Sequence, residues 1–122
     1  MAIKQREMPQ EEMKVKSNSQ ILLSIIIGNR QIGGSVVEFE GEEPLDKGRI
    51  KKLDLGKGKE IFDKVLLVQS NVLDSNAVTN KIVITHRFHY ENEDIINEFV
   101  IEDEVETHKD IFSVTAKYTF KK

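Results

Sequence analysis

Residues 112–120 alternate strictly between apolar and polar side chains, and this pattern constrains the fold more than any other feature of the chain. The apolar set is Phe112, Val114, Ala116, Tyr118 and Phe120, separated by Ser113, Thr115, Lys117 and Thr119. Because side chains of a β-strand point alternately to its two faces, the five apolar residues share one face. Such a strand belongs to an antiparallel sheet with one buried and one solvent-exposed face. The buried face requires a second layer of secondary structure to pack against.

Further strand signals precede this segment. They fall at residues 21–27, 31–39, 49–55, 64–73, 81–90 and 95–101, with turn residues between them. Gly28-Asn29 predicts a tight hairpin turn, and Gly33-Gly34 predicts a bulge or a close backbone approach. Short strands at this spacing predict an antiparallel β-sandwich of seven or eight strands, with a small barrel as the alternative. The predicted core comprises Ile25, Val36, Leu66, Val68, Ile82, Ile84, Phe88, Phe99, Val114, Tyr118 and Phe120.

The chain of 122 residues is long enough for one domain with its own core. Residues 1–20 are polar with weak periodicity, although Pro9 could open a short helix and Met13 and Val15 alternate as in a strand edge. We expect residues 1–20 to form a flexible N-terminal arm, which orders on a neighbouring subunit if it is functional. Residues 21–122 are expected to form a single β-sandwich domain.

The chain contains no cysteine, which excludes disulfides, thiolate catalysis and zinc–thiolate sites. The charged amino terminus is followed by no apolar run of the signal-peptide type. The longest apolar run, Ile21 to Ile27, is too short to cross a bilayer and contains Ser24. We therefore expect a cytoplasmic protein that does not act at a membrane, with export by a route that uses no cleaved signal as the alternative.

Charge is unevenly distributed along the chain, whose net charge is −3. Residues 47–64 contain seven basic and three acidic side chains, a local charge of +4. Residues 91–110 contain nine acidic side chains against Lys109 alone, a local charge of −8. One interpretation is that this segregated charge orients partners or neighbouring copies through the electric field of the protein. The alternative is that both segments are solvated loops whose charge has no function.

Acidic side chains also suggest a cation site. If the strands form a simple meander, the loops at residues 40–48, 73–80 and 102–110 lie at the same end of the domain. Calcium takes six to eight oxygen ligands from such loops. The candidate ligands are Glu42, Asp46, Asp74, Asn76 and Asp103. No D-x-D-x-D-G spacing is present, and a Greek-key connection would separate the loops.

No catalytic constellation is visible. His86 and His89 are three positions apart on one predicted strand and point to opposite faces, so they cannot share a metal. His86 lies on the apolar face, which predicts a hydrogen-bonded core histidine, whereas His89 and His108 are expected at the surface. The chain has no Gly-x-Ser-x-Gly elbow. The basic stretch includes a single aromatic residue, Phe62, which argues against nucleic-acid binding.

The segment from Val68 to Ile84 reads Val68-x-Ser70-x-Val72-x-Asp74-x-Asn76-x-x-Thr79-Asn80, followed by alternating apolar residues from Ile82. This pattern resembles a strand-loop-strand segment of small all-β proteins of unknown function from Bacteroidota. It covers about seventeen residues of the chain. The resemblance implies a bacterial all-β protein and brings no activity with it.

Two functional hypotheses follow. The leading one is a non-enzymatic protein-binding or assembly module that recognises a protein partner or another copy of itself. It rests on the segregated charge, the N-terminal arm and the lack of a catalytic set. The alternative is a divalent-cation or small-ligand binding sandwich that uses the acidic loops.

Overall fold

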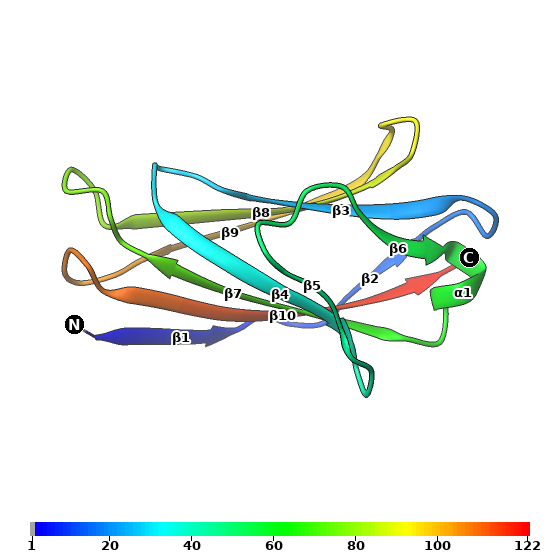
Figure 1. The fold of residues 1–122 in the computed structure, drawn as a ribbon, viewed down its shortest axis with the longest axis horizontal. Coiled ribbons are helices and arrows are strands. Elements are labelled where there is room, and N and C mark those ends of the chain that lie inside the picture. The colour runs from blue at the N-terminus through cyan, green and yellow to red at the C-terminus, as the bar shows by residue number, and fades with distance from the viewer. Residues whose placement is uncertain (1) are drawn as a thin grey trace.

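The computed structural model describes residues 2–122 as two β-sheets packed face to face (Figure 1). Its elements are β1 (Ile3–Glu7), β2 (Glu11–Lys14), β3 (Gln20–Ile27), β4 (Ile32–Phe39), β5 (Pro44–Gly48), β6 (Leu53–Lys57), α1 (Gly58–Ile61), β7 (Val65–Leu73), β8 (Lys81–Tyr90), β9 (Ile95–Glu104) and β10 (Ile111–Lys121). The larger sheet has the order β1-β10-β7-β4-β5, with β2 also paired to β10, and the smaller has the order β6-β3-β8-β9. The predicted all-β sandwich is confirmed.

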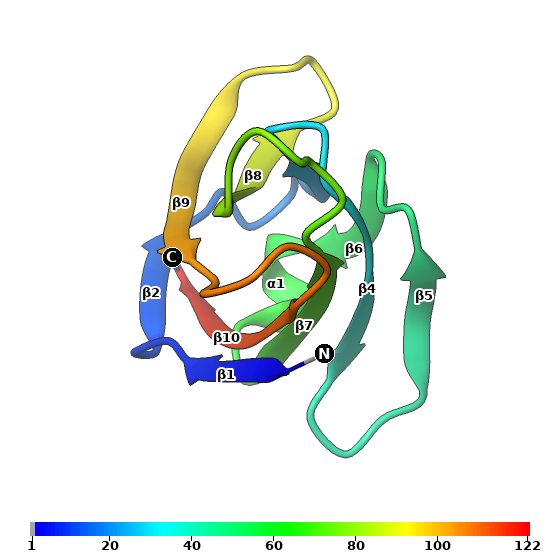
Figure 2. The same ribbon diagram turned by 90° about the vertical axis from the view of Figure 1, so that its left-hand side faces the viewer.

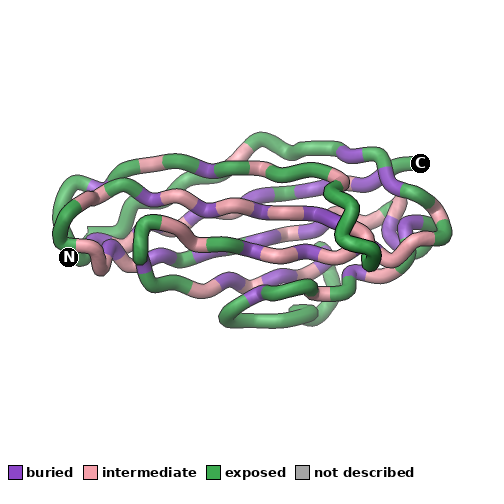
Figure 3. The backbone as a smooth tube through the Cα atoms, turned by 90° about the horizontal axis from the view of Figure 1, so that it is seen from above, coloured by how far each residue is buried: buried purple, intermediate pink, exposed green. Residues whose placement is uncertain are grey.

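Alternation decides which side chains enter the space between the sheets. Buried and exposed positions alternate along the strands (Figure 3). In β10 all five apolar residues of the pattern at 112–120 are buried, as predicted. In β8 the residues at 82, 84, 86 and 88 face inward in the same way. The core therefore lies between β7 and β10 of the larger sheet and β3 and β8 of the smaller one.

Two residues of the predicted core are only half-buried, Val36 and Phe99. In β4 the inward positions are Ser35, Val37 and Phe39, the last two in the core. The serine can point inward because its Oγ lies 2.6 Å from the Oγ of Ser70 on β7, which satisfies both buried hydroxyls. This pairing places Val36 on the outer face.

The amino-terminal segment differs from the flexible arm expected over residues 1–20. Strands β1 and β2 both pair with β10, in parallel, with Ile3 opposite Ile111 and Glu11 opposite Tyr118. Pro9 lies between the two strands, where the lack of an N–H breaks the ladder. Met13 and Val15 are buried and supply the apolar contact that holds the segment on the sandwich. The sandwich therefore begins at Ile3 instead of residue 21.

Strands β1, β2 and β5 bring the total to ten among the described residues, more than the seven or eight expected. Strand β5 forms within the predicted loop at residues 40–48 and starts at Pro44, which suits an edge strand because proline cannot donate to a ladder. Strands β3 and β4 do not form the hairpin predicted at Gly28-Asn29, since they belong to different sheets. Residues 28–31 carry the chain from one sheet to the other, and Asn29 and Arg30 take left-handed φ values of 55° and 56°.

Candidate functional site

The acidic residues predicted to bind calcium are divided between the two ends of the sandwich. The loops at 73–80 and 102–110 do lie together, because the Val105 N–H donates to the carbonyl of Asn80 over 3.0 Å and the Asp74 N–H to that of Asp110 over 2.9 Å. The loop at 40–48 lies at the other end, since Phe39 pairs with the beginning of β7 and not with its end. The chain is not a simple meander, so the three loops do not meet.

Each predicted ligand already has at least one partner, although Oδ2 of the buried Asp74 has none among the described residues. The carboxylate of Glu42 pairs with Lys64 at 3.0 Å, and that of Asp46 accepts from the N–H of Lys47. Asn76 binds backbone groups of its own loop and of Asn29. The buried Asp74 accepts a hydrogen bond of 2.8 Å from the Nε2 of Gln31. Within residues 2–122, no group of three or more His, Asp or Glu side chains is arranged to hold a metal ion.

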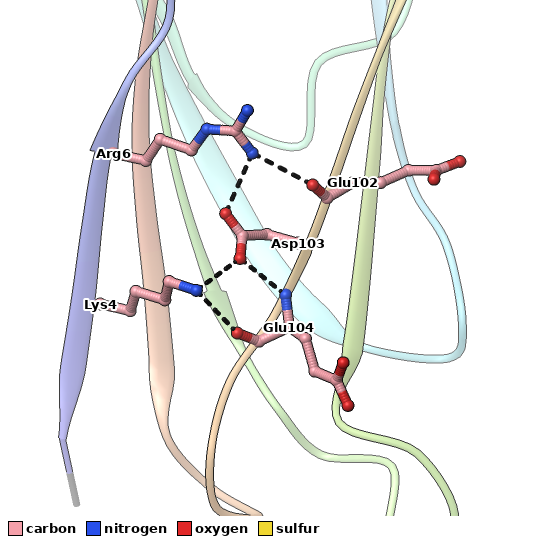
Figure 4. Close-up of polar contacts among 5 residues, drawn as sticks. All are labelled: Lys4, Arg6, Glu102, Asp103 and Glu104. Atoms are coloured by element: carbon pink, nitrogen blue, oxygen red, sulfur yellow. Dashed lines mark hydrogen bonds and ion pairs between the residues drawn. The ribbon is translucent and has the colours of Figure 1, made fainter.

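Asp103 fastens the edge of the larger sheet to the edge of the smaller one (Figure 4). Its two carboxylate oxygens bind Lys4 Nζ at 2.6 Å and Arg6 Nη1 at 3.0 Å, both from β1. Burial alone would raise the pKa of Asp103, but hydrogen bonds from Lys4, the Glu104 N–H and Arg6 outweigh it and lower the pKa below its usual 3.8. Lys4 and Arg6 also donate to the carbonyls of Glu104 and Glu102, so they cover part of the free edge of β9.

The histidines occupy three different environments. His86 is fully buried, as predicted, and its Nδ1 lies 2.6 Å from the hydroxyl of Tyr118. Burial lowers the pKa of His86 from 6.5 to about 4. His89, expected at the surface, is instead buried between the Ser24 hydroxyl and the carbonyl of Tyr90. His108 is exposed, as expected.

A groove of about 580 Å³ opens on one side of the sandwich, between β3, β4 and residues 48–52. Its apolar wall consists of Ile25, Ile26 and Ile27 from β3, Ile32 from β4, and Ile50 from the segment between β5 and β6. Ile26 is 41% exposed and Ile32 is 64% exposed, so branched side chains face solvent here. Gly33 allows the two sheets to approach, because a Cβ built on it would lie only 2.9 Å from Cδ1 of Ile27.

The groove is bordered by strand edges without a neighbouring strand. Strand β6 pairs only with residues 20–23 of β3, and the last contact on that side is the Ile25 N–H donating to the carbonyl of Ile50 over 3.0 Å. Strand β5 pairs only with residues 35–38 of β4. In the part of the chain that the structure describes, residues 26–27 and 32–34 therefore have no strand on the groove side.

Four cationic side chains line the same groove: Arg49, Lys51, Lys52 and Arg87. Lys52 pairs with Glu93 and Arg87 pairs with Glu98, each at 2.6 Å. Arg49 and Lys51 are exposed and make no ion pair with any described residue. The groove thus combines an apolar wall, free backbone groups and unpaired positive charge, which suits an extended chain with apolar and acidic side chains.

Sequence reasoning placed the cations on an edge strand at 49–55 but missed the groove. The strand begins only at Leu53, and residues 49–52 cross from the larger sheet to the smaller. The exposure of Ile26 and Ile32 leaves no signal in the sequence, because Ile26 belongs to an apolar run typical of a buried strand and Ile32 begins a strand without a clear apolar face. Only Gly33-Gly34 pointed to this region, through the close approach of the sheets.

Comparison with protein-family models, with curated proteins and with solved structures finds no match. No helix within residues 2–122 combines the length and the apolar character needed to span a membrane.

Proposed function

We propose that this domain is a non-enzymatic module that binds protein by accepting an extended strand at the groove between β3 and β4. The observation that carries the proposal is the coincidence of two free strand edges with an apolar wall at the same opening. A strand added there would gain backbone hydrogen bonds from the edges and bury Ile26 and Ile32. Each exposed branched side chain that becomes fully buried favours binding by up to about 1.5–3 kcal/mol.

The cations at the groove set the chemistry of the partner. Arg49 and Lys51 repel a basic segment and attract an acidic one. Their charge therefore contributes to the specificity of binding as well as to its affinity. Lysines at a free sheet edge also discourage unselective pairing with other strands. The partner is therefore a strand that alternates acidic with apolar side chains. A bacterial source and a cytoplasmic location are part of the same proposal.

The proposal is tested by sedimentation velocity on the full chain. The mass of the protein is measured at increasing protein concentration, at low salt and at high salt. We expect association that weakens as salt rises, because the Debye length falls from about 10 Å at 0.1 M to about 3 Å at 1 M. Binding of a labelled peptide that alternates Glu and Val, measured by fluorescence anisotropy, is the second readout. A chain that stays monomeric throughout and does not bind the peptide would contradict the proposal.

A further inference from the structure

We propose that the groove receives strand β9 of a second copy of this chain, so that copies join head to tail. This inference rests on the proposed function and names its partner. The two surfaces that would meet are the groove, represented by Ile32, Arg49 and Lys51, and the free edge of β9, represented by Glu98, Val100 and Glu102.

Strand β9 is an edge strand that pairs with β8 on one side only. Lys4 and Arg6 cover the carbonyls of Glu104 and Glu102 near its end. Those two carbonyls point away from β8, and backbone groups alternate in direction along a strand, so the groups of Glu98 and Val100 point outward as well. Where β2 does not contact β9, the segment before Glu102 thus offers backbone groups for a new strand to pair with.

Side chains on β9 match the groove in charge and polarity. Glu98, Val100 and Glu102 occupy alternate positions on one face, and all three are exposed, Val100 by 55%. Glu98 pairs with Arg87 of its own chain, so it would exchange that partner for a cation of the neighbouring copy. An apolar side chain between two acidic ones is the pattern that an apolar wall beside Arg49 and Lys51 would accept. The charge of the wider segments is also opposite, at −8 for residues 91–110 and +4 for residues 47–64. Opposite fields of this kind steer copies into one orientation.

The groove and the free edge of β9 are different surfaces of one molecule, and they adjoin where Arg87 of the groove pairs with Glu98 of β9. In the smaller sheet β3 and β9 are separated by β8, and β6 covers only the first half of β3. Figure 2 shows β9 on one side of the sandwich and β4 and β5 on the other. A contact between different surfaces of identical copies does not close on itself in a pair, so it produces rings or open chains. We therefore expect assemblies that grow with concentration instead of stopping at a dimer.

Two variants separate the surfaces. The groove variant, Arg49→Glu with Lys51→Glu, reverses the groove charge and leaves β9 intact. The edge variant, Val100→Asp, leaves the groove intact and places a third acid on the face of β9 that would enter the apolar wall. All three positions are exposed, so both variants are expected to fold. Lys117→Glu with Lys122→Glu is the control, since these exposed residues lie outside the groove and outside β2, the strand that contacts β9.

Sedimentation velocity then gives distinct outcomes. Wild type and the control variant should form growing chains, whereas each surface variant alone should be monomeric with an unchanged thermal midpoint. Mixed in equal amounts, the variants should form a complex of two chains and no larger, because the intact β9 of one enters the intact groove of the other. Chains formed by either surface variant alone, or a mixture that stays monomeric, would overturn the inference. If wild type still assembles in that case, the proposed function survives with a different surface.

Discussion

The Nδ1 atom of His86 on β8 lies 2.6 Å from the hydroxyl oxygen of Tyr118 on β10, and this contact joins the two sheets inside the core. Burial lowers the pKa of His86 to about 4, so the imidazole is neutral at neutral pH. Burial also raises the pKa of Tyr118, with a smaller contribution from Glu11, so the hydroxyl keeps its proton. The hydroxyl therefore donates to Nδ1, which places the imidazole proton on Nε2, an atom with no hydrogen-bond partner in the structure.

Removing the hydroxyl should destabilise the fold. Tyr118→Phe leaves Nδ1 of His86 buried without a donor, which costs about 1–3 kcal/mol of unfolding free energy. Urea denaturation of both proteins measures the difference. Tyr90→Phe is the matched control, because the Tyr90 hydroxyl accepts a hydrogen bond from the Lys16 N–H at an exposed site. An equal loss of unfolding free energy in the two variants would show that the buried Tyr118–His86 contact stabilises the fold no more than the exposed one.

Stability should fall between pH 6.5 and pH 4. Above pH 6.5 His86 is neutral in both states, but below it the unfolded chain binds a proton that the folded chain, with a pKa of about 4, does not. A lowering of this size corresponds to about 3 kcal/mol of unfolding free energy, lost across that window. Urea denaturation at a series of pH values measures the slope. An unchanged slope in His86→Phe would exclude His86 as its source.

A second loss is expected at lower pH. The pKa of Asp103 lies below its usual 3.8, so its interactions with Lys4 and Arg6 persist until the pH falls below that value. The two acid-induced steps are therefore separate, the first from the core histidine and the second from the carboxylate at the sheet edges. Urea denaturation of Asp103→Asn should show a smaller second loss and an unchanged first one; part of the second remains because the pKa values of Glu93 and Asp110 are also lowered.

The two adjacent glycines of β4 should respond differently to alanine. A Cβ on Gly33 would lie 2.6 Å from the carbonyl oxygen of Asn71, whereas the nearest atom to a Cβ on Gly34 is 3.5 Å away. Gly33→Ala must shift the backbone of β7 or displace Ile27, and overpacking of this kind costs about 1–3 kcal/mol. Gly34→Ala should be close to neutral. Thermal denaturation compares them, and similar midpoints would contradict the tight contacts of Gly33 with Asn71 and Ile27.

Strand β1 should loosen when Asp103 is replaced. All five residues of β1 are exposed, so its pairing with β10 and the two ion pairs hold it in place. Exposed ion pairs contribute about 0.2–1 kcal/mol each, so Asp103→Asn should change global stability little. Amide exchange of residues 3–7 should become faster, while that of β7 stays the same. Replacing the exposed Asp63 by Asn is the control, and equal effects would contradict the role of Asp103.

Local patterns predicted the interior of this fold well. Alternation in β8 and β10 identified the inward residues, because each strand has one apolar and one polar face. The same reasoning failed for β1, whose exposed residues carry no alternation, and for β4, where Ser35 takes an inward position. The positions of the loops depend on which sheet each strand joins. For this reason two predictions were wrong: that Glu42 and Asp74 lie together, and that β3 and β4 form a hairpin.

The groove could not have been predicted in the same way. It exists because β5 and β6 are shorter than the strands they border, which leaves the edges at residues 26–27 and 32–34 without a partner. Strand length at an edge depends on where the chain between residues 48 and 53 crosses between the sheets. That crossing is a tertiary property. The cations at 49–52 were visible in the sequence, but their position beside Ile26 and Ile32 was not.

Amide exchange followed by NMR, on dilute and on concentrated protein, tests the central claim most directly. If strands are added at the groove, the Ile27 amide on β3 and the Glu98 and Val100 amides on β9 should exchange more slowly as the mass of the assembly grows. The amides of β1 should not change. Growth in mass without added protection at Ile27 would contradict strand addition at this groove.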